Sequence, residues 1–522
     1  MGYKVGLGLG RVEQGPASFQ APVAVPPNAR KIGLGHSVPS TNLTNETWDF
    51  SQEQIIVEEK VDWLNNTNST DITPSDLENW LKEGPSSTEV IKNSPFCDKT
   101  VIENVFNAKN IFDELDAEDL NKARTRANPF ETIRAMFFMN RAALKMVNID
   151  AACDFMFTTM EENVRKTQCY LPLISSYTFC QENFSNKEGP IYFADICAGP
   201  GGFTEYILWR KKWWYKGFGM TLKDEHDFKV ADSCCASIAM FQPLYGADER
   251  GDICNPDNLT DFADRVANES KGGLHFMMSD GGFSVKGQES LQEVISKTIY
   301  VCQCILALKT LRPHGHFVTK TFDIFTPFSV GLLYLMYLCF ESVGIIKPNS
   351  SRPANSERYF VCRNFKADVR TTVIKEYMWK IVFRLWELKT LDKDILEIVD
   401  AEVLKQDAAF FQYIFDSNTR IGNQQIVALK KLAAFCRNPN LIEARQDDLR
   451  SQSLEYWKLP NQNRKRIFYR VQDLLTDLGL KICASDHWVR SGMNEFHKVN
   501  MFMPCQYLDQ FKKHIAQEWS MI

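Results

Sequence analysis

The sequence predicts an α/β protein whose largely parallel sheet carries helices on both faces. Strand candidates alternate with helical patterns between residues 96 and 435, and this alternation is typical of parallel sheets. A glycine-rich turn at residues 197–202 joins one strand candidate to the helical pattern that follows it. In such folds the loops after the strands gather at one edge of the sheet, so we expect the ligand site there.

The elements fall into three zones along the 522 residues. Residues 1–95 are rich in Gly, Pro, Asn and Ser, and we expect this zone to be partly flexible. Residues 96–435 form the predicted catalytic region, which begins with a helical extension over 101–146 that is interrupted near Pro129. Residues 436–522 hold a basic stretch at 463–466 and alternating apolar residues, and we expect a small C-terminal appendage of unknown role.

Within the catalytic region, the apolar pattern locates the individual elements. Strands are predicted at 191–194, 216–222, 274–279 and 315–319, and helices over 204–209, 290–311 and 328–340. The apolar run 328–340 is too short to cross a bilayer, so it predicts a buried helix and no membrane association.

Composition excludes a strongly basic protein. The net charge is −5 and the isoelectric point is near 6, so binding to nucleic acid would have to depend on local patches. Residues 122–134 and 209–216 are candidates, although the tryptophans of the second segment could equally pack inward. The fifteen cysteines show no paired CxxC spacing, which favours reduced thiols. No carboxylate or His cluster has the spacing of metal ligands, so we expect no metal.

The glycine-rich turn itself indicates the kind of ligand. Its residues lie between a strand and the start of a helix, where backbone N–H groups can face a nucleotide. The spacing is neither GxGxxG nor a phosphate-binding loop ending in Lys-Ser/Thr. A ligand without phosphates fits better, which points to S-adenosylmethionine, although a simple tight turn is the alternative. The expected contacts are Cys197, Ala198, Gly199, Pro200, Gly201, Gly202 and Phe203.

Four further residues occur in a characteristic order around this turn. Lys145 precedes it on a helical segment, and Asp280, Lys320 and Glu357 follow it. This arrangement resembles that of the FtsJ-type (RrmJ-like) ribose 2'-O-methyltransferases, which use a Lys-Asp-Lys-Glu tetrad. Longer segments are similar to the cap-specific mRNA (nucleoside-2'-O-)-methyltransferases within that group: 123–129, 209–213, 216–223 and 325–331. The resemblance covers roughly residues 96–450.

The resemblance implies a Rossmann-like sheet of the class I S-adenosylmethionine-dependent methyltransferases, with one antiparallel edge strand that begins near Glu357. It also implies roles for the tetrad. A ribose hydroxyl is a poor nucleophile that must be held in line with the methyl group while its proton is managed. Lys320 is then the candidate base or hydroxyl-orienting group, Asp280 holds it, and Lys145 and Glu357 complete the network.

Binding residues follow from the same resemblance. For S-adenosylmethionine it adds Asn140, Asp252 and Ile253, the last two at the expected end of the third strand. For the cap and the first nucleotides it implies Lys109, Asn110, Ile111, Phe112, Asp113, Arg124, Ser290, Leu291, Gln292 and Asn355. A methylated guanine favours aromatic stacking and a carboxylate partner, whereas Lys and Arg suit the triphosphate bridge. Phe112 and Asp113 could instead belong to the core and a helix surface.

We therefore expect a nuclear enzyme that methylates the 2'-oxygen of the first transcribed nucleotide of 5'-capped mRNA. The alternatives are an enzyme for the second nucleotide or another RNA, and a catalytically silent cap- or RNA-binding protein. Residues 2–15 look like the second half of a G-patch, which implies a DEAH-box RNA helicase as partner, although a glycine linker is the alternative. The guanylyltransferase-like and WW modules usual in the family are expected to be absent.

Overall fold

The computed structural model describes residues 46–86, 93–111, 115, 117–160, 190–229, 240–283, 291–388, 391 and 393–461. All of them belong to one unit of the chain, Glu46–Ile522. Several positions singled out in the sequence lie outside the described residues: 2–15, Phe112, Asp113, Ser290 and 463–466.

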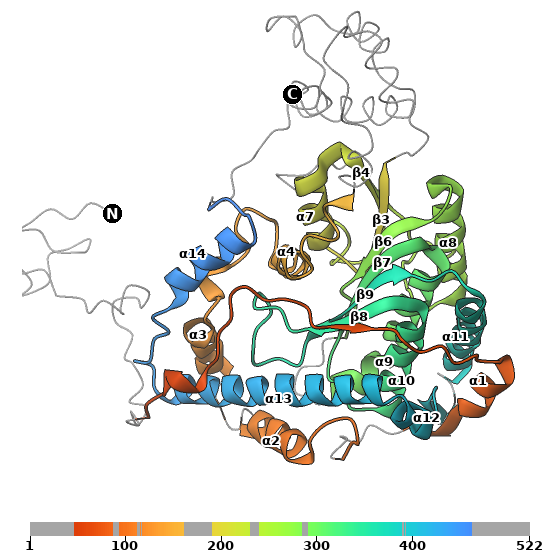
Figure 1. Ribbon diagram of the computed structural model, residues 1–522. Helices are drawn as coiled ribbons and strands as arrows, with labels where there is room; N and C mark the ends of the chain where they lie inside the picture. Colours follow the sequence, from red (N-terminus) through yellow and green to blue (C-terminus); the bar gives the residue numbers. More distant parts are fainter. Residues whose placement is uncertain are drawn as a thin grey trace, which may run out of the picture. The chain divides into compact units, whose positions relative to one another are not determined.

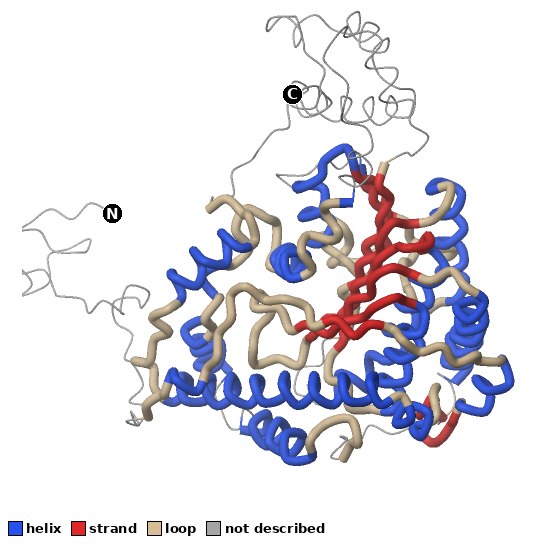
Figure 2. The backbone as a smooth tube through the Cα atoms, viewed as in Figure 1, coloured by secondary structure: helices blue, strands red, loops and turns tan. Residues whose placement is uncertain are grey.

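An eight-stranded sheet crosses this unit, as Figures 1 and 2 show. Its strands, in spatial order, are β1 (Trp63–Asn65), β8 (Phe340–Ile346), β9 (Arg358–Phe365), β7 (Leu311–Thr321), β6 (Leu274–Ser279), β3 (Ile191–Ile196), β4 (Tyr215–Met220) and β5 (Phe241–Pro243). The five strands from β7 to β5 are parallel. The α/β fold is confirmed, and the carboxyl ends of these strands share one edge.

The position of the antiparallel strand differs from the expectation of a sheet edge. β9 begins directly after Glu357 and runs antiparallel to both neighbours, with Tyr359 opposite Lys320 of β7 and Ile346 of β8. β9 is therefore an interior strand, and the prediction of an antiparallel edge strand there was wrong. Its run Tyr359–Cys362 is fully buried, which suits an interior strand with both faces covered. The edge strands are β1, which pairs antiparallel with β8, and β5.

Helices cover both faces of the sheet. On one face lie α4 (Ala142–Ala152) and α7 (Gly202–Lys211), which pack on side chains such as Phe276. On the other face lie α8 (Pro256–Ser270), α9 (Gln292–Thr310), α10 (Pro327–Cys339) and α11 (Val369–Leu388). Successive residues of a strand point to opposite faces, so Met277 joins the second cluster while Phe276 and Met278 join the first.

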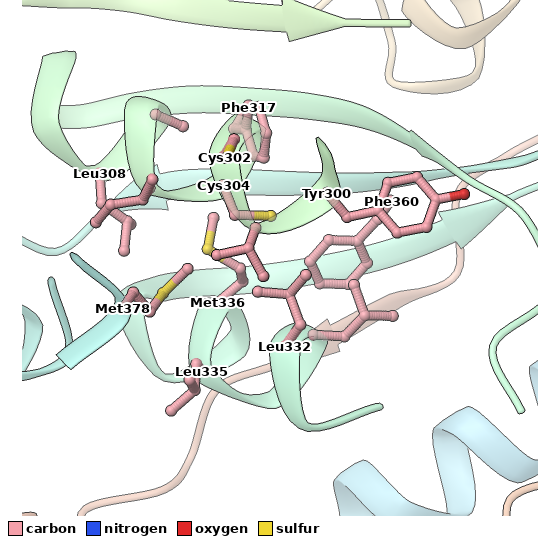
Figure 3. Packing of buried hydrophobic residues seen from close by; sticks show 14 of the residues in the cluster. Tyr300, Cys302, Cys304, Leu308, Phe317, Leu332, Leu335, Met336, Phe360 and Met378 are labelled. Atoms are coloured by element: carbon pink, nitrogen blue, oxygen red, sulfur yellow. The ribbon is translucent and has the colours of Figure 1, made fainter. Parts of the chain in front are cut away.

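The second face holds the larger core, part of which Figure 3 shows. Phe317 and Phe360 of the sheet lie beside Cys304 of α9 and Met336 of α10. The predicted buried helix at 328–340 is α10, which starts with Pro327 after the N-cap Thr326 and is buried from Phe328 to Cys339. Proline suits this first helical position because its missing N–H is not needed there. Within the described residues, no helix is long and apolar enough to cross a membrane.

The predicted helical extension consists of α2 (Lys99–Asn110), α3 (Ala117–Ala127) and α4, with Pro129 between the last two. The long helix α13 (Ala408–Arg437) packs on α2 and α3, as Figure 1 shows. The remaining helices are α1 (Pro74–Trp80), α12 (Ala401–Gln406) and α14 (Gln446–Tyr456). Two strands distant in the sequence, β2 (Lys82–Pro85) and β10 (Lys393–Glu397), form a separate antiparallel two-stranded sheet. There are also short 3-10 turns at Phe50–Gln52, Glu131–Ile133 and Lys212–Trp214.

Described residues on both sides of the expected catalytic region pack against it. β1 joins the sheet from residues 63–65, and Trp457, beyond residue 435, is completely buried in the α4–α7 cluster. The boundaries at residues 95 and 435 stay predictions.

Candidate active site

The tetrad residues come from four different elements and meet at the carboxyl edge of the parallel strands. Lys145 lies on α4, Asp280 follows β6, Lys320 is near the end of β7, and Glu357 precedes β9. Lys145 Nζ donates to Glu357 Oε2 at 2.9 Å and lies 3.6 Å from Asp280 Oδ2. Lys320 Nζ lies 3.4 Å from Asp280 Oδ1 and donates to the Asp280 carbonyl at 2.6 Å. The structure thus joins the four side chains into one chain of alternating charges.

Two hydroxyl groups complete this cluster. Tyr359 donates its phenolic O–H to Asp280 Oδ1 at 2.7 Å, and Ser351 donates to Glu357 Oε1 at 2.7 Å. Glu357 therefore faces a lysine with one oxygen and a hydroxyl with the other, whereas Asp280 faces a lysine with each oxygen and also accepts from Tyr359. These contacts hold both carboxylates in place, and the Lys145–Glu357 contact is a charge-assisted hydrogen bond.

The electrostatics of the cluster keep two of its members charged. Burial disfavours the ammonium of Lys145, but the carboxylates of Asp280 and Glu357 outweigh burial and hold the pKa of Lys145 above its usual range. Burial would likewise raise the pKa of Glu357, yet the neighbouring lysines, Lys145 first, lower this pKa to about 2. Near neutral pH, Lys145 is a fixed cation and Glu357 a fixed anion.

The glycine-rich turn lies at the same edge, between β3 and α7. The amide of Cys197 donates to Met220 at the end of β4, and the amide of Gly199 donates to the Thr221 hydroxyl at 3.2 Å. The Gly199–Pro200 peptide is cis, and Gly201 has a φ of 109°, a conformation that glycine adopts readily. A Cβ atom at Gly199 would collide with the backbone of residue 226. The turn therefore packs closely against the end of β4 and the loop that follows it.

The residues around this turn fit S-adenosylmethionine. Gly202 lies so close to Asn140 that a Cβ there would collide with the amide oxygen. Asn140 Oδ1 accepts from the Ala142 amide at 2.9 Å, while its buried Nδ2 has no partner among the described residues. A buried donor without a partner costs roughly 1–3 kcal/mol. Asn140 Nδ2 can offset that cost by binding a carboxylate such as that of the methionine moiety.

Asp252 lies near the turn but not at the end of a strand. The third parallel strand, β5, ends at Pro243, so Asp252 and Ile253 belong to the loop before α8, and the expectation that they end that strand was wrong. A Cβ at Gly251 would strike the backbone of Thr221, and this close approach brings the loop to the end of β4. Burial raises the pKa of the Cys197 thiol, and the Asp252 carboxylate adds to this shift. Ile253 is buried.

A cavity of about 840 Å³ opens beside the tetrad. Its walls come from the segment 52–62, from α3 and α13, and from the loop 347–356. Four of the residues that the resemblance implies for the cap and RNA line it: Lys109, Arg124, Gln292 and Asn355. Asn110, Ile111 and Leu291 are described but do not line this cavity. The tetrad is connected to the cavity through Ser351, which lines it and contacts Glu357.

Two of the lining residues, Lys109 and Arg124, differ in how far other side chains already bind their cationic groups. Lys109 Nζ is held by Asp323 at 3.2 Å and by the Ser356 hydroxyl at 2.9 Å, and its side chain is only 12% exposed. Arg124 is exposed and donates to Asn121 on its own helix. Lys109 therefore both stabilises the fold, by binding Asp323 and Ser356, and lines the cavity.

The aromatic and basic segment 209–216 faces the core where it is described. The Trp209 ring lies 5.1 Å from Phe137 and 5.7 Å from Phe138, centroid to centroid. Arg210 donates to the Trp457 carbonyl at 2.8 Å, and Trp214 packs on the α4–α7 cluster. Inward packing, one of the two interpretations of this segment, is thus the one that Trp209 and Trp214 adopt.

Two residues of the site were missed by sequence reasoning. Lys347 follows the apolar strand β8 and lines the cavity, and burial lowers its pKa to about 7 although Glu357 opposes this. Tyr359 lies opposite Lys320 in the sheet. The signal that could have found Lys347 is its place at the end of β8, since this strand is parallel to β7 and ends at the same edge. Within the described ranges no group of His, Cys, Asp and Glu is placed to hold a metal ion.

The chain is similar to known methyltransferases. Residues 138–365 match the family model described as FtsJ-like methyltransferase. The chain is 42% identical over 471 residues to cap-specific mRNA (nucleoside-2'-O-)-methyltransferase 1 of Danio rerio, covering 89% of this chain and 54% of that protein. The proteins of the same name from Drosophila melanogaster (42% over 480 residues, 91% and 58%) and Homo sapiens (41% over 469 residues, 89% and 54%) are similarly related. The chain spans about half the length of these relatives.

Proposed function

We propose that the protein methylates the ribose 2'-oxygen of the first transcribed nucleotide of 5'-capped mRNA with S-adenosylmethionine as methyl donor, because residues 138–365 match the family model described as FtsJ-like methyltransferase. The observation that carries the proposal is the charge-alternating chain Lys320–Asp280–Lys145–Glu357 beside the glycine-rich turn. The names of the relatives support the choice of a capped mRNA over other RNA substrates.

The residues of the site divide the work of this reaction. When bound, S-adenosylmethionine supplies an electrophilic methyl group on a sulfonium. The turn residues 197–203, with Asn140 and Asp252, would hold that molecule at the strand edge. Lys145 and Glu357 keep their charges near neutral pH, and the family resemblance makes Lys320 the candidate base or hydroxyl-orienting group. A positioned proton acceptor contributes roughly 10²–10⁴-fold to rate.

The cavity beside the tetrad suits an extended RNA end. Its walls combine cations such as Arg124 and Arg420 with amide side chains such as Asn355 and Gln424. Guanidinium groups suit phosphates, and amides can bind base edges or ribose hydroxyls. We expect the first transcribed nucleotide to enter from this side, because Asn355 is two residues from Glu357.

The test is transfer of labelled methyl groups to three short RNAs: capped, uncapped, and capped with the first ribose already methylated. Label on the first ribose of the capped RNA alone is the expected result. Label on the second ribose, or equal labelling of uncapped RNA, would assign the chain to a different RNA substrate. Binding of capped RNA without label would indicate a silent binding protein. Lys380→Ala is a matched control, since this lysine is 66% exposed and pairs with Glu78 on the surface.

The nuclear location and the helicase partner are two further expectations. Nuclear residence is part of the proposal and is tested by imaging the tagged full chain. The helicase contact of residues 2–15 stays a prediction.

A further inference from the structure

The loop between β8 and β9, residues 347–357, carries Glu357 of the tetrad and Asn355 of the cavity wall. Within the loop, two turns are closed by backbone hydrogen bonds, from the Ser351 amide to the Pro348 carbonyl and from the Asn355 amide to the Arg352 carbonyl. Neither bond reaches Glu357. The direction of the Glu357 carboxylate therefore depends on side chains that hold the loop from inside and from outside.

From inside, the ammonium group of Lys347 donates hydrogen bonds to several acceptors of the loop. Lys347 Nζ donates to the Glu357 carbonyl at 2.7 Å and to the Asn355 carbonyl at 2.8 Å. It also donates to the Asn355 side-chain oxygen and lies 3.4 Å from the Ser351 hydroxyl. That hydroxyl in turn donates to Glu357 Oε1. A single cation thus fixes the backbone of Glu357 and the side chain of Asn355 together.

From outside, the loop is docked on the helix that carries Lys145. Asn148 lies three residues after Lys145 on α4 and accepts from the Ser350 amide at 3.0 Å. Its Nδ2 donates to Glu59 Oε2, which also accepts from the Asn349 amide at 3.0 Å. Because residues three apart share a helix face, this contact sets the loop next to Lys145. Lys347 then determines how the end of the loop presents Glu357.

We propose that Lys347 is a positioning residue for methyl transfer: its ammonium aligns Glu357 with Lys145 and Asn355 with the RNA end in the cavity. The inference depends on the proposed function for its reaction but not for its geometry. The hydrogen bonds of Lys347 go to Ser351, Asn355 and the backbone carbonyl of Glu357, so it positions the Glu357 carboxylate through the loop as well as through its charge. Misplacement of a reacting group by about 1 Å can cost on the order of 10²-fold in rate.

The variant Lys347→Met removes the ammonium and keeps the length of the side chain. We expect kcat to fall by roughly 10–100-fold and KM for capped RNA to rise, while the Kd for S-adenosylmethionine changes less than twofold. Amide hydrogen exchange should become faster in residues 348–357 and stay unchanged in α7. An equal loss of S-adenosylmethionine binding, or a kcat within twofold of the wild type in the folded variant, would overturn the proposal.

Chemical rescue separates positioning from general damage to the fold. Lys347→Ala leaves space for a small amine, so added propylammonium should restore part of kcat. Tetramethylammonium at the same ionic strength has no N–H donor and should restore nothing. Equal effects of both salts would contradict the role of the ammonium as a donor. Lys380→Met serves as the matched surface control.

The wild-type chain in the same assay distinguishes the two proposals. A wild-type chain without turnover on capped RNA refutes the proposed function, and the hydrogen-exchange comparison then decides the role of Lys347 in the loop alone. An active wild-type chain with an equally active Lys347→Met variant refutes the positioning role alone.

Discussion

Asp195, the last polar residue of β3 before the glycine-rich turn, should make the stability of the protein depend on pH. Its side chain is completely buried, and Oδ2 accepts from the Thr204 amide at 2.9 Å and from the Thr204 hydroxyl at 2.7 Å. Thr204 lies in the first turn of α7, whose N-cap is Gly201. Because glycine has no side chain to cap the helix, Asp195 supplies the missing acceptor from the neighbouring strand.

Burial raises the pKa of Asp195 from 3.8 to about 8, although the Thr204 hydrogen bonds oppose the shift. Between these two values the folded state keeps a proton that the unfolded chain has released. The free energy of unfolding therefore falls by about 1.4 kcal/mol per pH unit as pH rises through this window. Over the whole window the loss reaches at most about 6 kcal/mol.

The variant Asp195→Asn keeps an amide oxygen for Thr204 but cannot titrate. Thermal unfolding of the full chain would be followed by circular dichroism from pH 5 to pH 8. The melting temperature of the variant minus that of the wild type should rise with pH by several degrees. Any cost in stability from burying the Asn amide hydrogens does not depend on pH, so it shifts the melting-temperature difference equally at every pH. A difference that does not change with pH would refute the reasoning, and the exposed Asp71→Asn variant provides the control.

Three further outcomes are expected. Lys320→Ala should abolish methyl transfer while the Kd for S-adenosylmethionine, measured by calorimetry, stays within twofold; near-normal turnover would remove Lys320 from its role. Asp252→Ala should weaken S-adenosylmethionine binding by roughly 10–100-fold, the effect of losing a charged hydrogen-bond partner, and an unchanged Kd would exclude the residue from the pocket. Gly202→Val should weaken the same binding and lower the melting temperature, because its Cβ would collide with Asn140 and with the backbone of Ala143; unaltered values in both assays would contradict the close packing.

The local parts of the fold could be predicted from the sequence. The strand at 274–279 has the predicted bounds, and the turn at 197–202 joins β3 to α7 as expected. These features depend on apolar periodicity and on glycine at a position with positive φ, which are properties of a few neighbouring residues. The family resemblance implied the tetrad, and the structure brings all four side chains within 3.6 Å of a partner.

Features that depend on distant pairing could not be predicted. The interior place of β9 is set by its pairing with both β7 and β8, and a buried apolar strand has the same pattern wherever it lies in the sheet. Lys109 binds Asp323, 214 positions away in the chain, and neither sequence context shows this contact. The place of Lys347 after β8 is visible in the sequence, but its contacts with Asn355 and Glu357 are not, because only the folded loop brings these acceptors together.

The tetrad couples activity to stability. Removing one member of a buried ion pair typically costs 3–5 kcal/mol, since the remaining charge is left without compensation. The side chains of Glu357 and Lys145 are only 8% and 18% exposed, so loss of the Glu357 carboxylate leaves a cation that burial disfavours. The same carboxylate is oriented by Ser351 and by the loop that Lys347 holds. Substitutions here should therefore lower the melting temperature as well as the rate, and loss of Lys347, which donates to the carbonyls of Asn355 and Glu357, should do the same.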